Sequence, residues 1–240
     1  MKIIAHRGYS ASFPENTPEG WNAAFATGAF AIEADVRLSA DGHCICAHDA
    51  DLKRLFDRPE QPEALALKDL LGLHNAAGGR IAVLAEVLEH AGHDRHVLLD
   101  LKDEAPHSLE VIWNAIVDIV PEGKRRFVIA GCHTIDAVRF FAARSETGIL
   151  GFIPTQDQAE VFHGAGAGII RFWEGDVTAT RIQQLQQLGA EVWVTTGGQG
   201  TPFRGGETAP QNLARLAAAG ASGVLVDDVA MAKATLETMP

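Results

Sequence analysis

Short apolar runs alternate with segments of helical periodicity along most of the chain. Apolar runs bounded by turn residues are typical of strands that are buried on both faces, as in a parallel sheet. The eight predicted strands are residues 2–5, 31–37, 96–101, 126–131, 148–153, 168–173, 191–196 and 223–227. Helices are predicted between and after them, beginning at residues 18, 83, 108, 135, 156, 178, 210 and 229.

A strand–helix unit repeated eight times in 240 residues matches a (β/α)8 TIM barrel, which typically has ~250 residues. A doubly wound sheet is the alternative, although one such domain usually contains fewer strands. Because no linker or shift in composition interrupts the repeat, the sequence predicts a single α/β domain over residues 1–240. After the second strand, Asp41-Gly42 predicts a turn into an extended piece at 43–48, and a helix is expected at 62–71.

Polar and aromatic side chains are concentrated where the predicted strands end. They are His6, Arg7, Glu33, Asp35, Asp100, Lys102, Arg171, Trp173, Trp193, Thr195, Asp227 and Asp228. The active sites of (β/α)8 barrels lie at the C-terminal ends of the strands. The predicted fold therefore gathers these side chains around one mouth.

Three carboxylates of this set are expected to converge. Glu33 and Asp35 are two residues apart on one strand and so share a face, and Asp100 ends the next barrel strand. Unpaired carboxylates inside a barrel are unfavourable, and a divalent cation would resolve the problem. Oxygen ligands favour Mg²⁺, Ca²⁺ or Mn²⁺ over zinc. The alternative is a buried ion-pair network with Arg7, Arg37 or Lys102.

Two histidines, His6 and His48, flank this predicted metal site. A lone histidine at a strand end is more often structural than catalytic. Two histidines beside a metal site make a catalytic role more plausible. Hydrolysis of a phosphodiester needs one group to accept a proton from the nucleophile and another to protonate the leaving oxygen. A histidine pair can do both near neutral pH, so we expect His6 and His48 to be catalytic.

The charge of the chain narrows its possible partners. Its formal net charge is −11, whereas nucleic-acid binding requires a basic face, so we expect a small-molecule ligand and no nucleic acid. An anionic substrate would be repelled at long range and would need a local positive centre. A metal ion with a few arginines and lysines would supply it.

The cysteines and the N-terminus indicate the compartment. The three cysteines are an odd number, which argues against a complete disulfide framework. Cys44 and Cys46 share a face of a short strand and are expected to be buried, since a metal pair would need two more soft ligands. The first apolar run is too short for a signal peptide, and no stretch approaches the ~20 apolar residues of a membrane span. We therefore expect a cytoplasmic protein, while the oligomeric state stays open.

Residues 3–54 closely resemble the glycerophosphodiester phosphodiesterase family. The matching motifs are His6-Arg7-Gly8, Pro14-Glu15-Asn16-Thr17, Glu33-x-Asp35, Asp41-Gly42, and His48-Asp49 followed by Leu52 and Arg54. The resemblance continues more weakly to the end of the chain, through Asp100-Leu101-Lys102, Trp193 and residues 223–228.

This resemblance implies a (β/α)8 barrel that binds a divalent cation. It also implies an enzyme that hydrolyses glycerophosphodiesters to sn-glycerol 3-phosphate and an alcohol. The metal ligands that it implies are Glu33, Asp35 and Asp100. His6 and His48 resemble the general acid/base pair of the family. The residues expected to contact the substrate or to order its site are Arg7, Glu15, Asn16, Lys102 and Trp193.

Several positions depart from the family pattern, most of them where the alcohol or the glycerol would sit. The third ligand is usually Glu, and Asp100 is shorter by about 1.5 Å. Cys132-His133 and a Gly-rich loop at 197–206 also differ. Arg171 is either a ligand for a second anionic group or a structural ion-pair partner. A related phosphodiesterase or lyase acting on a sugar-phosphate diester or a lysophospholipid stays open, as does an inactive barrel that binds a phosphorylated ligand.

Overall fold

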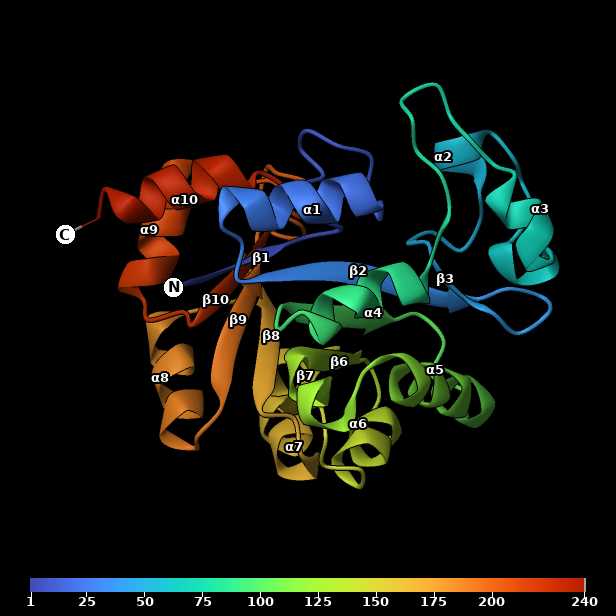
Figure 1. The fold of residues 1–240 in the computed structure, drawn as a ribbon. Helices are drawn as coiled ribbons and strands as arrows, with labels where there is room; N and C mark the ends of the chain where they lie inside the picture. Colours follow the sequence, from blue (N-terminus) through green and yellow to red (C-terminus); the bar gives the residue numbers. More distant parts are fainter. Residues whose placement is uncertain (240) are drawn as a thin grey trace.

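Eight parallel strands close into a barrel in the computed structural model, which describes residues 1–239 (Figure 1). They are β1 (Lys2–Ala5), β2 (Ala31–Leu38), β5 (His96–Leu101), β6 (Val128–Cys132), β7 (Gly148–Phe152), β8 (Ile169–Trp173), β9 (Glu191–Thr195) and β10 (Gly223–Val226). Strand β1 pairs in parallel with both β10 and β2, which closes the ring. The predicted (β/α)8 barrel is confirmed.

A layer of helices covers the outside of the barrel, one after each barrel strand or its extension (Figure 1). They are α1 (Pro18–Thr27), α4 (Leu84–Gly92), α5 (Pro106–Ile119), α6 (Ile135–Ala142), α7 (Ala159–Ala165), α8 (Ala179–Gln187), α9 (Pro210–Ala218) and α10 (Val229–Glu237). Thr17, Thr134 and Thr178 cap the starts of three of them by accepting a backbone N–H bond of the first turn. Within residues 1–239, no helix is both long enough and apolar enough to cross a membrane.

Two short 3₁₀ segments, η2 (Glu122–Phe127) and η3 (Gln156–Gln158), complete the outer layer. The first of them occupies the beginning of the strand predicted at 126–131, so that β6 starts only at Val128. Lys124 bonds to the carbonyl oxygen of Pro121 through its backbone N–H, which winds this segment into a turn before it can join the sheet.

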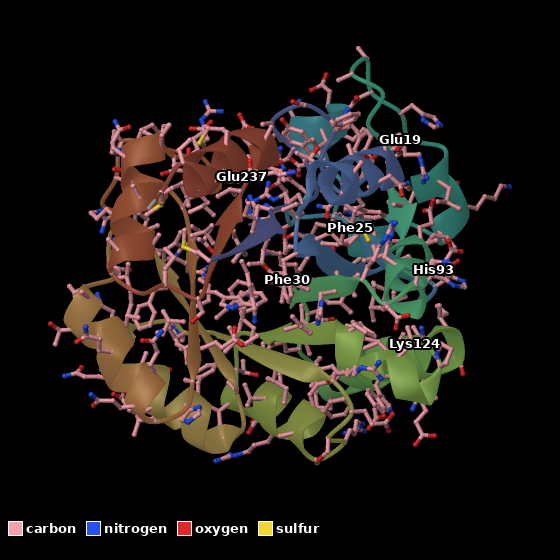
Figure 2. The ribbon with its side chains drawn as sticks, turned by 60° about the vertical axis from the view of Figure 1, so that its left-hand side comes forward. Glu19, Phe25, Phe30, His93, Lys124 and Glu237 are labelled. Carbon is pink, nitrogen blue, oxygen red and sulfur yellow. The ribbon has the colours of Figure 1, made fainter. Side chains whose placement is uncertain are left out.

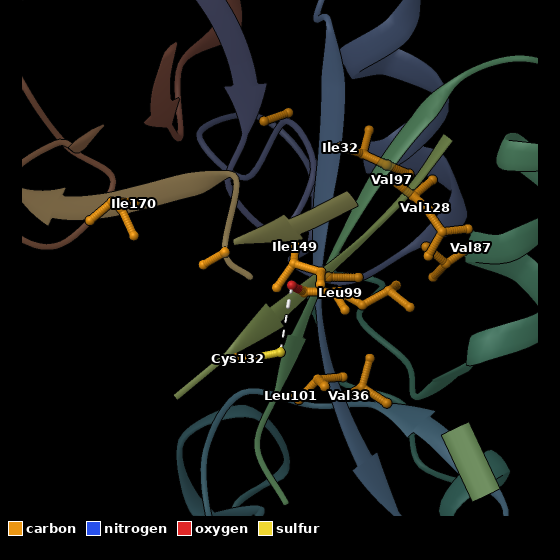
Figure 3. Close-up of a cluster of buried hydrophobic side chains, with 14 of the residues drawn as sticks. Ile32, Val36, Val87, Val97, Leu99, Leu101, Val128, Cys132, Ile149 and Ile170 are labelled. Carbon is orange, nitrogen blue, oxygen red and sulfur yellow. Dashed lines mark hydrogen bonds between the residues drawn. The ribbon is translucent and has the colours of Figure 1, made fainter. Parts of the chain in front are cut away.

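Alternate residues of each strand pack outward against the helices and form the larger core. Figure 3 shows part of it, in which Ile32, Val97 and Leu99 lie among other aliphatic side chains. Cys132 belongs to this cluster, and its thiol lies 3.7 Å from the carbonyl oxygen of Ala130. All three cysteines are buried and free, as expected for small apolar residues. Burial raises the pKa of the Cys44 thiol to about 11.

The other residues of each strand point into the barrel. Inside the barrel they form a second, smaller core of buried side chains: Ile4, Ala31, Leu98, Ile129, Leu150, Phe152, Trp193 and Leu225. Phe30, labelled in Figure 2, packs against this cluster. The barrel is therefore filled below its mouth, and a ligand can enter only at the C-terminal ends of the strands.

The connection between β2 and α4 is the largest departure from the simple repeat. It carries β3 (Cys44–Cys46), α2 (Lys53–Phe56), η1 (Pro62–Ala64), α3 (Leu67–Leu71) and β4 (Ala82–Val83). Strand β3 pairs antiparallel with β2, and β4 pairs with β3. We call residues 44–83 the arm; in Figure 1 its helices α2 and α3 stand apart from the barrel helices.

The arm has a small core of its own, formed by Ile45, Ala47, Leu52, Leu70 and Ile81. The helix predicted at 62–71 is wrong as a single element. Leu65 is extended between η1 and α3, and its carbonyl oxygen accepts a bond from the N–H of Ala40 at 2.9 Å. This bond to the β2–β3 turn takes the carbonyl out of the helix.

Candidate active site

The mouth of the barrel is lined by inward-facing side chains at and just after the C-terminal ends of the strands. A cavity of about 210 Å³ opens there, bordered by His6, Arg7, Glu33, His48, Asp100, Lys102, His133, Phe152, Arg171, Trp173, Thr195, Gly205 and Leu225. Most of the predicted site residues therefore meet in one place, within a lining that comes from the ends of all eight barrel strands and from the arm.

Glu33, Asp35 and Asp100 converge at the base of this cavity. Asp35 and Asp100 face each other in the register of β2 and β5. One oxygen from each of the three carboxylates lies within 4.8 Å of the others, and all three residues are buried. The Oε1 atom of Glu33 is buried without a hydrogen-bond partner. A compact set of buried carboxylate oxygens with an unsatisfied acceptor fits a divalent cation such as Mg²⁺, Ca²⁺ or Mn²⁺.

The pKa values of two of these carboxylates, Glu33 and Asp35, are shifted in opposite directions. Burial, together with the charges of Asp35 and Asp100, raises the pKa of Glu33 well above its usual value. Burial also acts to raise the pKa of Asp35, but the nearby charges of Lys102 and Arg7 outweigh it and lower that pKa. Crowding of carboxylates is what makes Glu33 resist ionisation, so a bound cation would stabilise the fully charged set.

Lys102 and Arg7 compensate part of this negative charge. The Nζ atom of Lys102 lies 2.9 Å from Asp35 and 2.7 Å from Asp100. The backbone N–H of Arg7 donates to Glu33 at 2.7 Å, and the Arg7 guanidinium lies 3.4 Å from both Asp35 and Glu15. Part of the ion-pair network that the sequence offered as an alternative to a metal is thus present, but it leaves Glu33 Oε1 without a partner.

Glu15 and Asn16 order the loop between β1 and α1. The amide of Asn16 donates to Asp35 at 2.8 Å and accepts from the backbone N–H of Asp35 at 3.2 Å. Glu15 accepts two bonds of 2.7 Å from Arg54, which joins the loop to the arm. Arg7 and Asn16 both have positive φ, 56° and 54°, although neither is glycine. Such backbone strain is retained where neighbouring contacts enforce it, commonly at functional sites.

The two histidines are held in matching ways, each by a carboxylate at Nδ1. The Nδ1 atom of His6 lies 2.8 Å from an oxygen of Asp227, which follows β10. The Nδ1 atom of His48 lies 2.8 Å from an oxygen of its neighbour Asp49. In each ring the carboxylate engages Nδ1 and leaves Nε2 available for proton transfer. Burial, more than any charge, lowers the pKa of His48.

A glycine closes the space behind the His6–Asp227 pair. Gly206 has a φ of +93°, and a Cβ atom there would lie 2.0 Å from Asp227 Oδ1 and 2.5 Å from His6 Nδ1. The backbone N–H of Asp227 donates to the Gly206 carbonyl at 2.8 Å. The loop that the sequence singled out at 197–206 therefore ends directly against one of the histidines.

Trp193 does not lie at the mouth, and its expected contact with substrate is wrong. Its side chain is 1% exposed and belongs to the inner core at the opposite end of the barrel. The indole N–H donates to Glu191 at 3.0 Å, and Lys2 lies over its ring. Trp193 is only two residues from the start of β9, whereas Thr195 of the same row reaches the cavity.

His133 is a site residue whose role the sequence did not reveal. Its Nε2 atom lies 2.6 Å from Asp100 Oδ1, and its ring stacks on Phe152 with 4.7 Å between centroids. Asp100 is thereby bound through both oxygens, by His133 and by Lys102. The only signal was its position directly after a barrel strand, because the contact joins residues 33 positions apart.

A second cavity of about 290 Å³ lies beside the first and shares His6, Arg7 and Gly205 with it. Its other walls come from the β1–α1 loop and the arm, including Phe13, Leu55 and Phe56. The mouth thus consists of an inner cavity rich in charged groups and an outer cavity of mixed polarity, with His6 at their boundary.

Sequence comparison identifies the class of protein that this fold and site define. The model of the glycerophosphoryl diester phosphodiesterase family matches residues 6–231. The chain therefore belongs to that family, as the motifs of its first 54 residues indicated.

Individual relatives agree with the family but match the chain only in part. A glycerophosphodiester phosphodiesterase of Caldanaerobacter subterraneus is 35% identical over 107 residues, or 42% of this chain and 44% of the relative. Human glycerophosphodiester phosphodiesterase 1 is 30% identical over 122 residues, or 47% of this chain and 37% of the relative. The chain thus matches less than half the length of these relatives.

Solved structures share the fold over nearly the whole chain. A phosphodiesterase from Oleispira antarctica in complex with the product sn-glycerol-3-phosphate superposes with a TM-score of 0.84 at 19% identity, covering 99% of this chain and 97% of that one. A glycerophosphodiester phosphodiesterase from Thermotoga maritima gives 0.76 at 21% identity, covering 95% of each chain. At this level of identity the similarity concerns the fold.

Proposed function

We propose that this protein hydrolyses glycerophosphodiesters to sn-glycerol 3-phosphate and an alcohol, using a divalent cation and a histidine pair. The observation that carries the proposal is that His6 and His48 border the same cavity as the carboxylates Glu33 and Asp100. Membership of the family supports the reaction type, and the product bound to the Oleispira antarctica phosphodiesterase is the one proposed here.

Proton transfer is assigned to the two histidines. In the first step the glycerol hydroxyl next to the phosphate attacks phosphorus, one histidine accepts its proton, and the other protonates the departing alcohol oxygen. The product of this step is a cyclic phosphate. In the second step water attacks phosphorus, the roles of the histidines reverse, and the ring opens to sn-glycerol 3-phosphate. Asp227 and Asp49 engage Nδ1 of the two rings, which leaves Nε2 of each ring for this proton transfer.

Substrate binding is assigned to Arg7 and Lys102, with Glu15 and Asn16 ordering the loop that carries Arg7. Glu33, Asp35 and Asp100 would hold the cation. When bound, the cation would stabilise the negative charge that builds on the phosphoryl oxygens. The shorter Asp100 is oriented by Lys102 and His133 from both sides, which fixes the direction of its carboxylate.

One assay tests this proposal directly. The purified protein is incubated with glycerophosphocholine, glycerophosphoethanolamine or glycerophosphoglycerol in the presence of Mg²⁺, Ca²⁺, Mn²⁺ or EDTA, and sn-glycerol 3-phosphate is measured. We expect turnover with at least one cation and its loss in EDTA, restored when the cation is added back. No turnover of any diester with any cation would refute the proposed function.

The outer cavity favours one alternative substrate, a lysophospholipid. Phe13 on its rim is 38% exposed, and Leu55 and Phe56 also border it, so an acyl chain would find apolar contacts there. The same assay with lysophosphatidylcholine distinguishes the two. Faster release of choline from lysophosphatidylcholine than from glycerophosphocholine would favour the alternative, and binding of sn-glycerol 3-phosphate without any turnover would indicate an inactive barrel.

A further inference from the structure

Arg171 is the unusual cation of the mouth. It lies on β8 in the inward-facing row, it is 8% exposed, and it borders the inner cavity with Glu33, His48 and Lys102. Its guanidinium lies 4.1 Å from the ring centroid of Trp173 and 4.9 Å from that of Phe152. Two aromatic rings therefore fix the direction of a positive charge that faces the cavity.

The charge of Arg171 has no partner among residues 1–239. Three side chains with a permanent positive charge border the inner cavity, and two of them are paired, Arg7 with Glu15 and Asp35 and Lys102 with Asp35 and Asp100. Arg171 makes no ion pair, and its Nε atom is buried without a hydrogen-bond partner. The carboxylates of Asp100, Asp176 and Glu33 influence it only from a distance. A structural ion pair, one of the two roles open from the sequence, is thus absent.

Leaving this group unpaired is costly. A buried charge without a hydrogen-bonding partner is strongly unfavourable, so buried arginines are normally paired. Burial lowers the pKa of Arg171 to about 10, which still leaves the side chain charged at neutral pH. An anion placed in the cavity would remove this cost, and a guanidinium is well suited to two parallel bonds with phosphate oxygens.

The balance of charge identifies the anion. A divalent cation held by the three carboxylates, together with Lys102, would balance their three negative charges. Glu15 compensates Arg7. The single charge left over on Arg171 equals the single negative charge of a phosphodiester. We propose that Arg171 forms an anion site that binds the non-bridging phosphate oxygens of the substrate from the β8 side of the cavity.

This inference rests on the proposed function for the identity of the diester, but the anion site itself does not. Its test therefore measures binding as well as turnover. The main variant is Arg171→Met, which keeps an unbranched side chain between the two rings and removes the charge. Arg171→Lys keeps a charge without the planar fork. The matched control is Arg144→Met, because Arg144 also stacks on aromatic rings, those of Phe140 and Trp113, but lies on the outside of the barrel.

Binding of sn-glycerol 3-phosphate is measured by calorimetry on cation-loaded and on EDTA-treated protein, and melting curves check that each variant is folded. We expect Arg171→Met to raise the Kd about 10- to 100-fold in both states, because a charge-assisted pair is lost. Arg171→Lys should fall between it and the wild type, and Arg144→Met should bind as the wild type does. A Kd for folded Arg171→Met within about twofold of the wild type would overturn the proposal. If Arg171→Met does not fold, an unchanged Kd in Arg171→Lys overturns it, and a raised one supports it.

Turnover separates the diester from a second anionic group. With glycerophosphoglycerol, whose only charge is on the diester, Arg171→Met should lower kcat/KM by a factor similar to the loss in binding. Normal turnover with weakened binding of sn-glycerol 3-phosphate would mean that Arg171 recognises a second charge, which contradicts the assignment. If the wild type binds sn-glycerol 3-phosphate through Arg171 but cleaves no diester, the proposed function fails and the anion site stands.

Discussion

The two histidines of the mouth are supported by two unlike regions of the molecule. His6 follows β1, and its partner Asp227 follows β10, so both rest on the main core between strands and helices. His48 and Asp49 lie on the arm, whose own core contains only a few buried side chains around Leu70, while Cys44, Cys46 and Ala82 of its strands join the main core. One half of the proposed acid/base pair thus rests on the large core and the other half on the arm, which has a much smaller core of its own.

Polar contacts attach the arm to the barrel beside the site. Arg54 of the arm donates two bonds to Glu15 of the β1–α1 loop, and Arg37 of β2 donates to the carbonyl oxygen of His48 at 3.0 Å. Local opening of such an appendage requires less free energy than global unfolding. From this comparison we expect that mutations in the arm can lower activity without lowering global stability.

The largest effects should follow from removing either histidine. His6→Ala and His48→Ala should each lower kcat by about 10²–10⁴-fold, because each loses a general acid/base, while both proteins stay folded. Steady-state kinetics with glycerophosphoglycerol and melting curves check this. A near-normal kcat in one variant would show that this histidine is not a general acid or base. The contrast between the two supporting regions would then no longer apply to catalysis.

Two matched core substitutions should separate the regions. Leu70 in the arm and Leu185 on α8 are both fully buried, and replacing either with Ala should cost about 2–5 kcal/mol locally. In Leu70→Ala we expect activity to be lost at a lower temperature than the main unfolding transition, because the arm opens first. In Leu185→Ala we expect activity to be lost at the same temperature as the main unfolding transition. Thermal inactivation followed alongside circular dichroism makes the measurement, and coincident curves in both variants would show that the arm is no separate unit.

The contact between Glu15 and Arg54 should matter for activity more than for stability. Glu15→Gln weakens a two-bond ion pair that holds the arm beside Arg7, and pairs of this kind contribute up to about 1 kcal/mol, so kcat/KM should fall by about fivefold. Glu160→Gln is the control, since Glu160 forms a similar pair with Arg181 on the outer helices. Equal effects of the two substitutions on kcat/KM would contradict a specific role for Glu15.

The smallest expected effect concerns pH. Burial lowers the pKa of His48 below 6.5, so His48 stays neutral to a lower pH than a free histidine. If His48 is the base of the first step, kcat/KM should fall with decreasing pH only below 6.5, as the proton is taken up. Opening the arm would expose His48. The pH below which kcat/KM falls should therefore rise toward 6.5 in Leu70→Ala and stay unchanged in Leu185→Ala. Identical profiles in all three proteins would contradict this expected shift.

Much of the barrel could be predicted because its signals are local. Continuous apolar runs mark buried parallel strands, and the helix starts predicted at residues 18, 135 and 178 lie within one residue of the observed starts. The convergence of Glu33 and Asp35 also followed from their spacing on one strand. These features depend on neighbours along the chain and not on the packing of distant segments.

The site features that the sequence did not predict depend on how deep a residue lies in the barrel and on contacts between different strands. Trp193 and Thr195 have the same parity on β9, and only the height of the strand in the barrel decides that one is in the core and the other at the mouth. The contact of His133 with Asp100 depends on the alignment of β5 with β6. The missing partner of Arg171 could be seen only once every carboxylate of the mouth had been located.

The close approach of Gly206 to the His6–Asp227 pair has a consequence for redesign of specificity by loop exchange. Gly205 borders both cavities, so the loop from Gly198 to Gly205 is a natural place to graft loops that select other alcohols. Gly206 marks where such a graft must stop. Any side chain there would collide with Asp227 and His6, so libraries that vary the loop should keep glycine at this position.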